Sequence, residues 1–231
     1  MAVDVAKRLA VIGTDTGVGK TAVTLLLAQG LRALGHAVWL HKPVACGGWD
    51  GGSSEDGRAL RAACADGQDP ATVCALEFPE PCSPHLAALA AGAEVRLSGM
   101  VATVQGLVGQ ADGRADVILE TAGGLLAPLT TARETNADLL AALAWPVLLV
   151  TRPFLGTLNH TQLTVNECRR RGLRICGLIV NHHAAVAPSL AVRSAASELA
   201  MLTGLPVLAE LPFQPSQDHA LRLAQAVRLC I

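Results

Sequence analysis

The segment GTDTGVGKT at residues 13–21 combines closely spaced glycines with a lysine and a threonine, which are residue types that bind phosphate groups. It follows the apolar run Leu9–Gly13 and opens a stretch of helical period, which is the context that a phosphate-binding loop requires. The first glycine stands one residue earlier than in the strict pattern, but the core GVGKT is intact. In such a loop, backbone N–H groups meet phosphate oxygens, Lys20 reaches the terminal phosphates and the Thr21 hydroxyl can ligate Mg²⁺.

Two more charged residues stand where predicted strands end. Lys42 follows the run 37–41 and precedes Pro43, which is expected to stop strand pairing, and Glu120 closes another apolar run. The carboxyl ends of parallel strands share the edge where open α/β sheets bind ligands. A carboxylate there can complete a Mg²⁺ shell with Thr21 and phosphate oxygens. The alternatives are a solvated surface lysine and a capping or surface glutamate.

Two polar segments follow later strands. Asn181 ends a predicted strand, and its amide offers a donor and an acceptor that suit a purine edge, although a loop asparagine can equally stabilise its own turn. Residues 155–160, LGTLNH, begin a predicted helix. Free N–H groups at a helix start form an anion site suited to a carboxylate, but most such starts bind only water or a cap.

Short apolar runs alternate with longer helical segments, which is typical of a parallel sheet flanked by helices. The interval 56–114 is mostly helical in pattern and is broken near three prolines. We therefore predict one domain over residues 1–231, with a three-layer α/β/α architecture and a mostly parallel central sheet. The predicted strands are Leu9–Gly13, Ala37–His41, Val117–Glu120, Val147–Thr151, Ile175–Val180 and Pro206–Glu210, and the predicted helices are Lys20–Leu34, Thr135–Ala144, Thr157–Arg171 and Ser189–Thr203.

Composition excludes several classes of protein. With 231 residues, 51% hydrophobic and 16% charged, the chain is long and apolar enough for a real core. A net charge of -1 argues against a general nucleic-acid binder. Seven cysteines without a CxxC pair suggest reduced thiols. The longest apolar run, Leu139–Val150, contains Pro146 and falls short of the roughly 20 residues of a membrane span, so we expect a soluble cytoplasmic protein.

Taken in order, the motifs resemble those of the dethiobiotin synthetases over Leu9 to Leu211. They are GTDTGVGKT at Gly13, HKPVACG at His41, SPH at Ser83, LETAGG at Leu119, LGTLNHTQLT at Leu155, VN at Val180 and ELP at Glu210. The resemblance implies a P-loop NTPase-like fold and a homodimer in biotin synthesis. It also implies that 7,8-diaminononanoate, CO2 and MgATP give dethiobiotin, ADP and phosphate through a carbamate and a carbamic-phosphoric mixed anhydride.

The resemblance implies residue roles as well. Mg²⁺ would be held by Thr21, Asp56 and Glu120, while Lys20 and Lys42 would neutralise charge on the carbamate and the transferring phosphoryl group. Nucleotide contacts would come from Gly17, Val18, Gly19, Lys20, Thr21, Asp56, Glu120, Thr121, Ala122, Gly123, Asn181, Pro212, Phe213 and Gln214. Substrate contacts would come from Thr16, Lys42 and Cys46 and, across a dimer interface, from the backbone of Gly156, Thr157, Leu158 and Asn159 in the partner subunit.

Three positions depart from the family pattern. Cys46 stands where serine is common, Thr121 replaces a glycine and would bring a Cβ near the phosphates, and His182 stands where an aspartate often follows the asparagine. A thiol is a weaker hydrogen-bonding group than a hydroxyl. These changes bear on substrate affinity and base selectivity more than on the reaction.

Three other functions fit parts of the sequence. A regulatory ATPase of the ParA and MinD type shares the loop architecture but usually carries a signature lysine where this chain has Asp15. An amidoligase related to cobyrinic acid diamide synthase usually has a glutamine-hydrolysing domain, for which 231 residues leave no room. A nucleotide-binding relative without activity is the third alternative.

Overall fold

A computed structural model describes residues 7–182, 184 and 189–231. Within these residues, seven strands form one sheet in the order β3-β2-β4-β1-β5-β6-β7, and every pairing is parallel. All strands therefore end at one edge of the sheet. Their bounds are β1 Arg8–Gly13, β2 Val38–Cys46, β3 Cys74–Phe78, β4 Asp116–Glu120, β5 Val147–Thr151, β6 Ile175–Asn181 and β7 Val207–Leu211.

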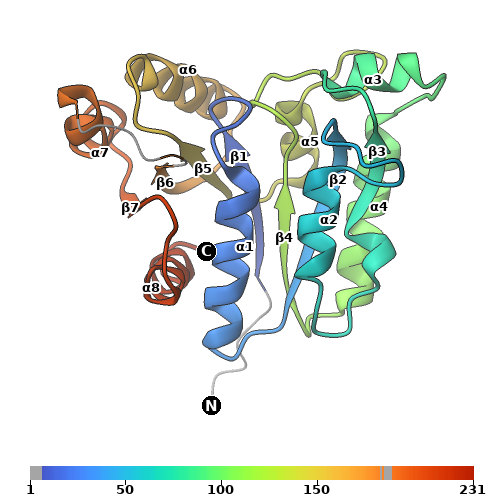
Figure 1. Cartoon of the computed structure of the whole chain (residues 1–231), viewed down its shortest axis with the longest axis horizontal. Helices are drawn as coiled ribbons and strands as arrows, with labels where there is room; N and C mark the ends of the chain where they lie inside the picture. The colour runs from blue at the N-terminus through green and yellow to red at the C-terminus, as the bar shows by residue number, and fades with distance from the viewer. Residues whose placement is uncertain (1–6, 183, 185–188) are drawn as a thin grey trace.

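Helices cover both faces of the sheet, which confirms the predicted three layers (Figure 1). One core joins the sheet to α1, α2 and α8, a second joins it to α4, α5, α6 and α7, and a third packs α3 with parts of α4 and α5 against β2 and β3. The backbones of α1 and α8 approach closely, because a Cβ on Gly30 would lie 2.0 Å from the Ala220 carbonyl oxygen. The helices are α1 Lys20–Ala33, α2 Glu55–Ala62, α3 Pro84–Ala90, α4 Leu97–Ala111, α5 Asn136–Leu143, α6 Thr157–Arg170, α7 Leu190–Thr203 and α8 Gln217–Arg228, with a 3₁₀ turn at Pro70–Thr72.

The six predicted strands and four predicted helices are confirmed, with small differences at their ends. The largest difference is in β2, which does not stop at Pro43 but continues to Cys46. The N–H group of Lys42 donates to the Val73 carbonyl on the β3 side at 2.7 Å. The nitrogen of Pro43 therefore faces the β4 side, where pairing has already ended at His41. The proline costs no sheet hydrogen bond in this position.

The interval after residue 56 contains a strand that the sequence pattern does not reveal. β3, with the sequence CALEF, is only five residues long and carries Glu77 near its end. It lies at the edge of the sheet and pairs with the extension of β2. In the part of the chain that the structure describes, no helix is long and apolar enough to cross a membrane.

Candidate active site

The phosphate-binding loop joins β1 to α1 at the carboxyl edge of the sheet. Gly17 and Gly19 have φ angles of 73° and 87°, which favour glycine, and Gly19 is the N-cap of α1. No side chain caps this helix, so the N–H groups of its first turn are available to phosphate oxygens. The Lys20 ammonium is buried inside the loop and donates to the Asp15 carbonyl at 3.3 Å. The loop therefore has the geometry of an anion site.

Four side chains from four elements meet beside this loop, and we call them the phosphate-site cluster: Thr21 of α1, Lys42 of β2, Asp56 of α2 and Glu120 of β4. Lys42 Nζ lies 2.5 Å from Asp56 Oδ2 and 2.6 Å from Glu120 Oε1. Thr21 Oγ1 lies 2.7 Å from Glu120 Oε1 and 2.8 Å from Asp56 Oδ1. The predicted convergence of Lys42 and Glu120 on the loop is thus present in the structure.

The two lysines of the site differ in their pKa values. Burial lowers the pKa of Lys42, but the charges of Glu120 and Asp56 outweigh burial and raise it above its usual value. Burial, followed by repulsion from Lys42, lowers the pKa of Lys20 to about 8, against the attraction of the carboxylates. Burial raises the pKa of the Asp56 carboxyl, but the Lys42 charge, the hydrogen bonds from Lys42 and Thr21 and the Lys20 charge together outweigh burial and lower it. Lys42 is therefore firmly charged. An anion bound in the loop would stabilise the charged form of Lys20.

The donor atoms of the phosphate-site cluster are of the kind that bind a magnesium ion. Glu120 is fully buried, and its Oε2 atom has no hydrogen-bond partner. Within residues 7–182, 184 and 189–231, no group of three or more His, Cys, Asp or Glu side chains could form an all-protein metal site. Mg²⁺ is usually bound by one or two carboxylates together with phosphates and water. Two carboxylates and the Thr21 hydroxyl match that requirement.

A cavity of about 590 Å³ opens over the loop and the cluster. Most of the predicted site residues line it: Thr16, Gly17, Gly19, Lys20, Thr21, Lys42, Cys46, Asp56, Glu120, Ala122 and Gly123. Sequence reasoning missed further lining residues, namely Ala45, Glu55, Pro81, Cys82, Ser83, Pro84 and Ala127. A serine followed by proline at a helix start was the available signal for part of this wall, since Pro84 is the first residue of α3. Two smaller cavities against α4 contain no lysine.

Six of the predicted nucleotide contacts do not line the cavity, and two of them, Val18 and Thr121, adjoin segments that do. Val18 is fully buried, and its carbonyl accepts a hydrogen bond from Asn181 Nδ2 at 3.0 Å. Thr121 is also buried, and its hydroxyl donates to the Val11 carbonyl at 3.3 Å. The Thr121 side chain therefore lies against the backbone of β1 and is not part of the cavity wall.

Other predicted residues lie outside the cavity along the same sheet edge. Asn181 pairs with Leu211 at the ends of β6 and β7, so Pro212, Phe213 and Gln214 leave β7 next to it. Residues 156–159 form the start of α6, where Gly156 has a φ of 106°. The cavity of the same chain does not include this helix start.

Two departures from the family pattern have simple structural roles. Burial, with a smaller contribution from Cys82, raises the pKa of the Cys46 thiol to about 11 despite the opposing charge of Lys42. This shift disfavours the thiolate, which is the nucleophilic form of cysteine. His182 Nε2 lies 2.8 Å from Glu210 Oε1, beside the last strand.

Comparison with known proteins identifies the family. A family model described as an AAA domain matches residues 7–220. The chain is 44% identical over 208 residues to the ATP-dependent dethiobiotin synthetase of Anaeromyxobacter dehalogenans strain 2CP-C, covering 90% of each chain. The chain belongs to the family of ATP-dependent dethiobiotin synthetases. The synthetase of Xanthomonas campestris pv. campestris strain 8004 is 36% identical over 230 residues, with coverage of 95% and 96%.

Solved structures show how widely the synthetase fold is shared. A ParA family ATPase from Chlorobium tepidum aligns with a TM-score of 0.56 at 14% identity, over 96% of each chain. Cobyrinic acid a,c-diamide synthase from Mycobacterium smegmatis, with bound ADP and magnesium, aligns with a TM-score of 0.56 at 18% identity, over 97% of this chain and 94% of that one. At these identities the likeness establishes the P-loop α/β fold and no activity.

Proposed function

We propose that the chain converts 7,8-diaminononanoate, CO2 and ATP to dethiobiotin, ADP and phosphate. The observation that carries this proposal is the contact of Lys42 with both carboxylates and its position beside the phosphate loop, in a cavity large enough for phosphates and a small diamine. Sequence similarity to dethiobiotin synthetases over nine-tenths of the chain supports the choice of substrates. Such chemistry needs positioning and charge neutralisation more than a protein nucleophile.

The proposed roles of the residues follow from their places. The loop N–H groups, Lys20 and the first turn of α1 would hold the ATP phosphates. Thr21, Asp56 and Glu120 would hold Mg²⁺, which when bound supplies charge stabilisation to the transferring phosphoryl group. Lys42 would move from the carboxylates toward the carbamate, because a cation between them would repel its ammonium. Thr16 and Cys46, which line the same cavity, would contact the diamine end of the substrate.

The proposed reaction divides into three balanced steps. One amine of the substrate adds to CO2 and loses a proton, giving a carbamate. A carbamate oxygen then attacks the γ-phosphorus, and the bond to the β-phosphate oxygen breaks to release ADP. The second amine attacks the carbamate carbon, closes the ureido ring, loses a proton and expels phosphate. Lys42 and Lys20 would offset the negative charge that the phosphoryl transfer brings together.

The base of ATP and the carboxylate of the diamine substrate would bind to the segments outside the cavity. Asn181, Pro212, Phe213 and Gln214 would surround the base, with the Asn181 oxygen as acceptor, because its amide nitrogen already binds the Val18 carbonyl. The helix start at 156–159 would receive the substrate carboxylate in the cavity of the partner subunit. The adjacent Leu155 is 89% exposed, and the helix start carries no side-chain cap, which suits an interface between two copies.

Mass spectrometry of the diamine, MgATP and ¹⁸O-labelled bicarbonate with the purified chain tests the proposal. We expect dethiobiotin and ADP in equal amounts, with one labelled oxygen in the released phosphate, because the carbamate oxygen that attacks phosphorus leaves with it. ATP hydrolysis that ignores the diamine would contradict the proposal and favour a switching ATPase of the ParA and MinD type. A dimer in light scattering, about twice the 23.8 kDa of the chain, tests the shared carboxylate site.

A further inference from the structure

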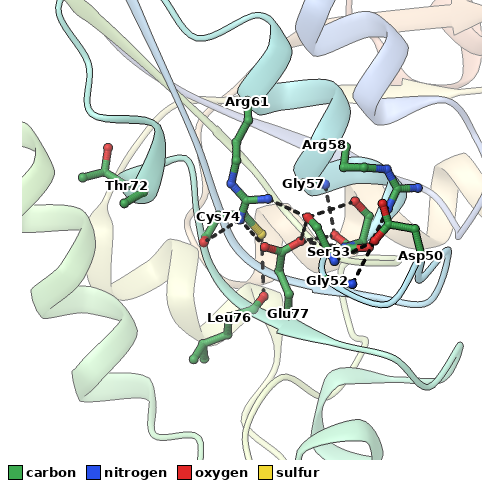
Figure 2. A network of polar contacts seen from close by, with 12 residues as sticks. Asp50, Gly52, Ser53, Gly57, Arg58, Arg61, Thr72, Cys74, Leu76 and Glu77 are labelled. Atoms are coloured by element: carbon green, nitrogen blue, oxygen red, sulfur yellow. Dashed lines mark hydrogen bonds and ion pairs between the residues drawn. The ribbon is translucent and has the colours of Figure 1, made fainter.

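A second group of polar side chains joins α2 and the residues before it to β3, and Figure 2 shows it from close by. We call it the anchor network: Ser53, Ser54, Arg61 and Glu77. Glu77 Oε2 accepts from Ser53 Oγ at 2.8 Å, from the Ser54 N–H group at 2.8 Å and from Ser54 Oγ at 2.6 Å. Glu77 Oε1 forms an ion pair with Arg61. One carboxylate on β3 therefore accepts four hydrogen bonds from α2 and the residues before it.

These bonds fix α2 at both ends. Ser54 is the N-cap, and its hydroxyl accepts from the Gly57 N–H group at 3.0 Å while donating to Glu77. Arg61, in the last turn, also donates to Ser53 Oγ at 2.6 Å. The carboxylate of Glu77 lies directly over the first turn, because a Cβ on Gly57 would stand 2.2 Å from its Oε2 atom.

The helix has few other attachments. It is eight residues long, and only Gly57 and Leu60 are buried within it. The side chain of Asp56 is 41% exposed, so packing alone does not hold it against the phosphate-site cluster. Asp56 lies between Ser54 and Gly57 in sequence, the two residues that the anchor network fixes. Its contacts with Thr21 and Lys42 therefore depend on the same bonds.

We propose that Glu77 is a positioning residue of the active site, whose carboxylate holds the first turn of α2 so that Asp56 reaches the magnesium position. The proposal rests on the proposed function, in which Asp56 is a Mg²⁺ ligand. Glu77 itself does not line the cavity, and its carboxylate accepts from Ser53, Ser54 and Arg61. Although burial raises its pKa, the bonds from Arg61, Ser54 and Ser53 lower it to about 2, so Glu77 is ionised under physiological conditions.

The test measures the effect of Glu77→Gln on metal affinity. Mn²⁺ is titrated into the purified chain with substoichiometric ADP, and electron paramagnetic resonance monitors metal binding. The glutamine keeps the shape, but its NH₂ group must face either Arg61 or the serine donors. We expect the apparent Kd for Mn²⁺ to rise about 10- to 100-fold, as for loss of a group that orients a metal ligand, while ADP binding without metal is unchanged. Asp56→Asn should give a similar rise, and the double variant should add nothing, because both changes remove one ligand.

Two further variants make the result decisive. Glu94→Gln is the matched control, because Glu94 forms an exposed ion pair with Arg96 and its loss should leave Mn²⁺ affinity unchanged. If Glu77→Gln does not fold, Ser53→Ala removes the two bonds that Ser53 Oγ makes with Glu77 and Arg61 and should shift the Kd in the same direction by less. A folded Glu77→Gln variant with unaltered Mn²⁺ affinity, or additive effects of Glu77→Gln and Asp56→Asn, would overturn the proposal. Either result would leave the synthesis of dethiobiotin by the unmodified chain, and with it the proposed function, intact.

Discussion

The phosphate-site cluster and the anchor network flank the same turn of α2, yet their polar atoms are paired to different degrees. In the cluster, Lys42 and Glu120 are 3% and 0% exposed, and one oxygen of Glu120 lacks a partner. In the anchor network, both oxygens of Glu77 accept hydrogen bonds, and the side chains of Glu77 and Arg61 are 12% and 27% exposed.

The difference separates a binding site from a structural support. A buried polar atom without a partner costs about 1–3 kcal/mol, so it indicates a place that a ligand completes. None of the side chains of the anchor network contains such an atom. Changes in the cluster should therefore reduce turnover, whereas changes in the network should act on stability and on the position of Asp56.

Loss of Lys42 should have the largest effect. We expect Lys42→Ala to reduce dethiobiotin formation by at least about 10²-fold, on the scale of removing one electrostatic donor from an active site. Turnover measured by mass spectrometry at saturating MgATP checks this, with circular dichroism to confirm folding. Lys7→Ala is the control, because Lys7 Nζ donates to the backbone oxygen of Ile231 and does not line the cavity. Near-normal turnover of Lys42→Ala would remove this lysine from the mechanism.

A methyl group on Gly57 should break the anchor network. Because its Cβ would lie 2.2 Å from Glu77 Oε2, the carboxylate must move away from Ser54. We expect Gly57→Ala to lower the free energy of unfolding by about 1–3 kcal/mol, as overpacking does, in urea titrations. Gly52→Ala is the matched control, because its Cβ would meet nothing closer than 3.9 Å. Equal stabilities of the two variants would contradict the supporting role of the network.

Removal of the Cys46 thiol should have the smallest effect. With a pKa of about 11 the thiol is neutral, and the reaction requires no covalent residue. We expect Cys46→Ala to keep most of its turnover, well above that of Lys42→Ala, in the same mass-spectrometric assay. Cys82→Ala, at another cysteine that lines the cavity, serves as the comparison. Complete loss of turnover in Cys46→Ala would show that position 46 takes part in the chemistry.

The sequence predicts the phosphate-site cluster better than the anchor network, for physical reasons. Gly19, Lys20 and Glu120 stand at strand ends or helix starts, where apolar periodicity reveals their place. Glu77 interrupts a five-residue edge strand, whose pattern is too short to recognise, and its partners lie 16 to 24 residues away in a glycine-rich loop and a polar helix. The hydrogen bond of Thr121 to the Val11 carbonyl could not be predicted either, because a motif does not show on which side of a strand end a side chain lies.

The central claim is that the partly unpaired cluster, and not the saturated network, is the working centre. The most direct test is a crystal structure of the chain with ADP and Mn²⁺, in which anomalous scattering locates the metal. We predict one peak within coordination distance of Thr21 Oγ1 and the carboxylates of Asp56 and Glu120, with Lys42 Nζ displaced from between them. A nucleotide-bound structure with its metal peak elsewhere, or with Lys42 still joining both carboxylates, would contradict this account.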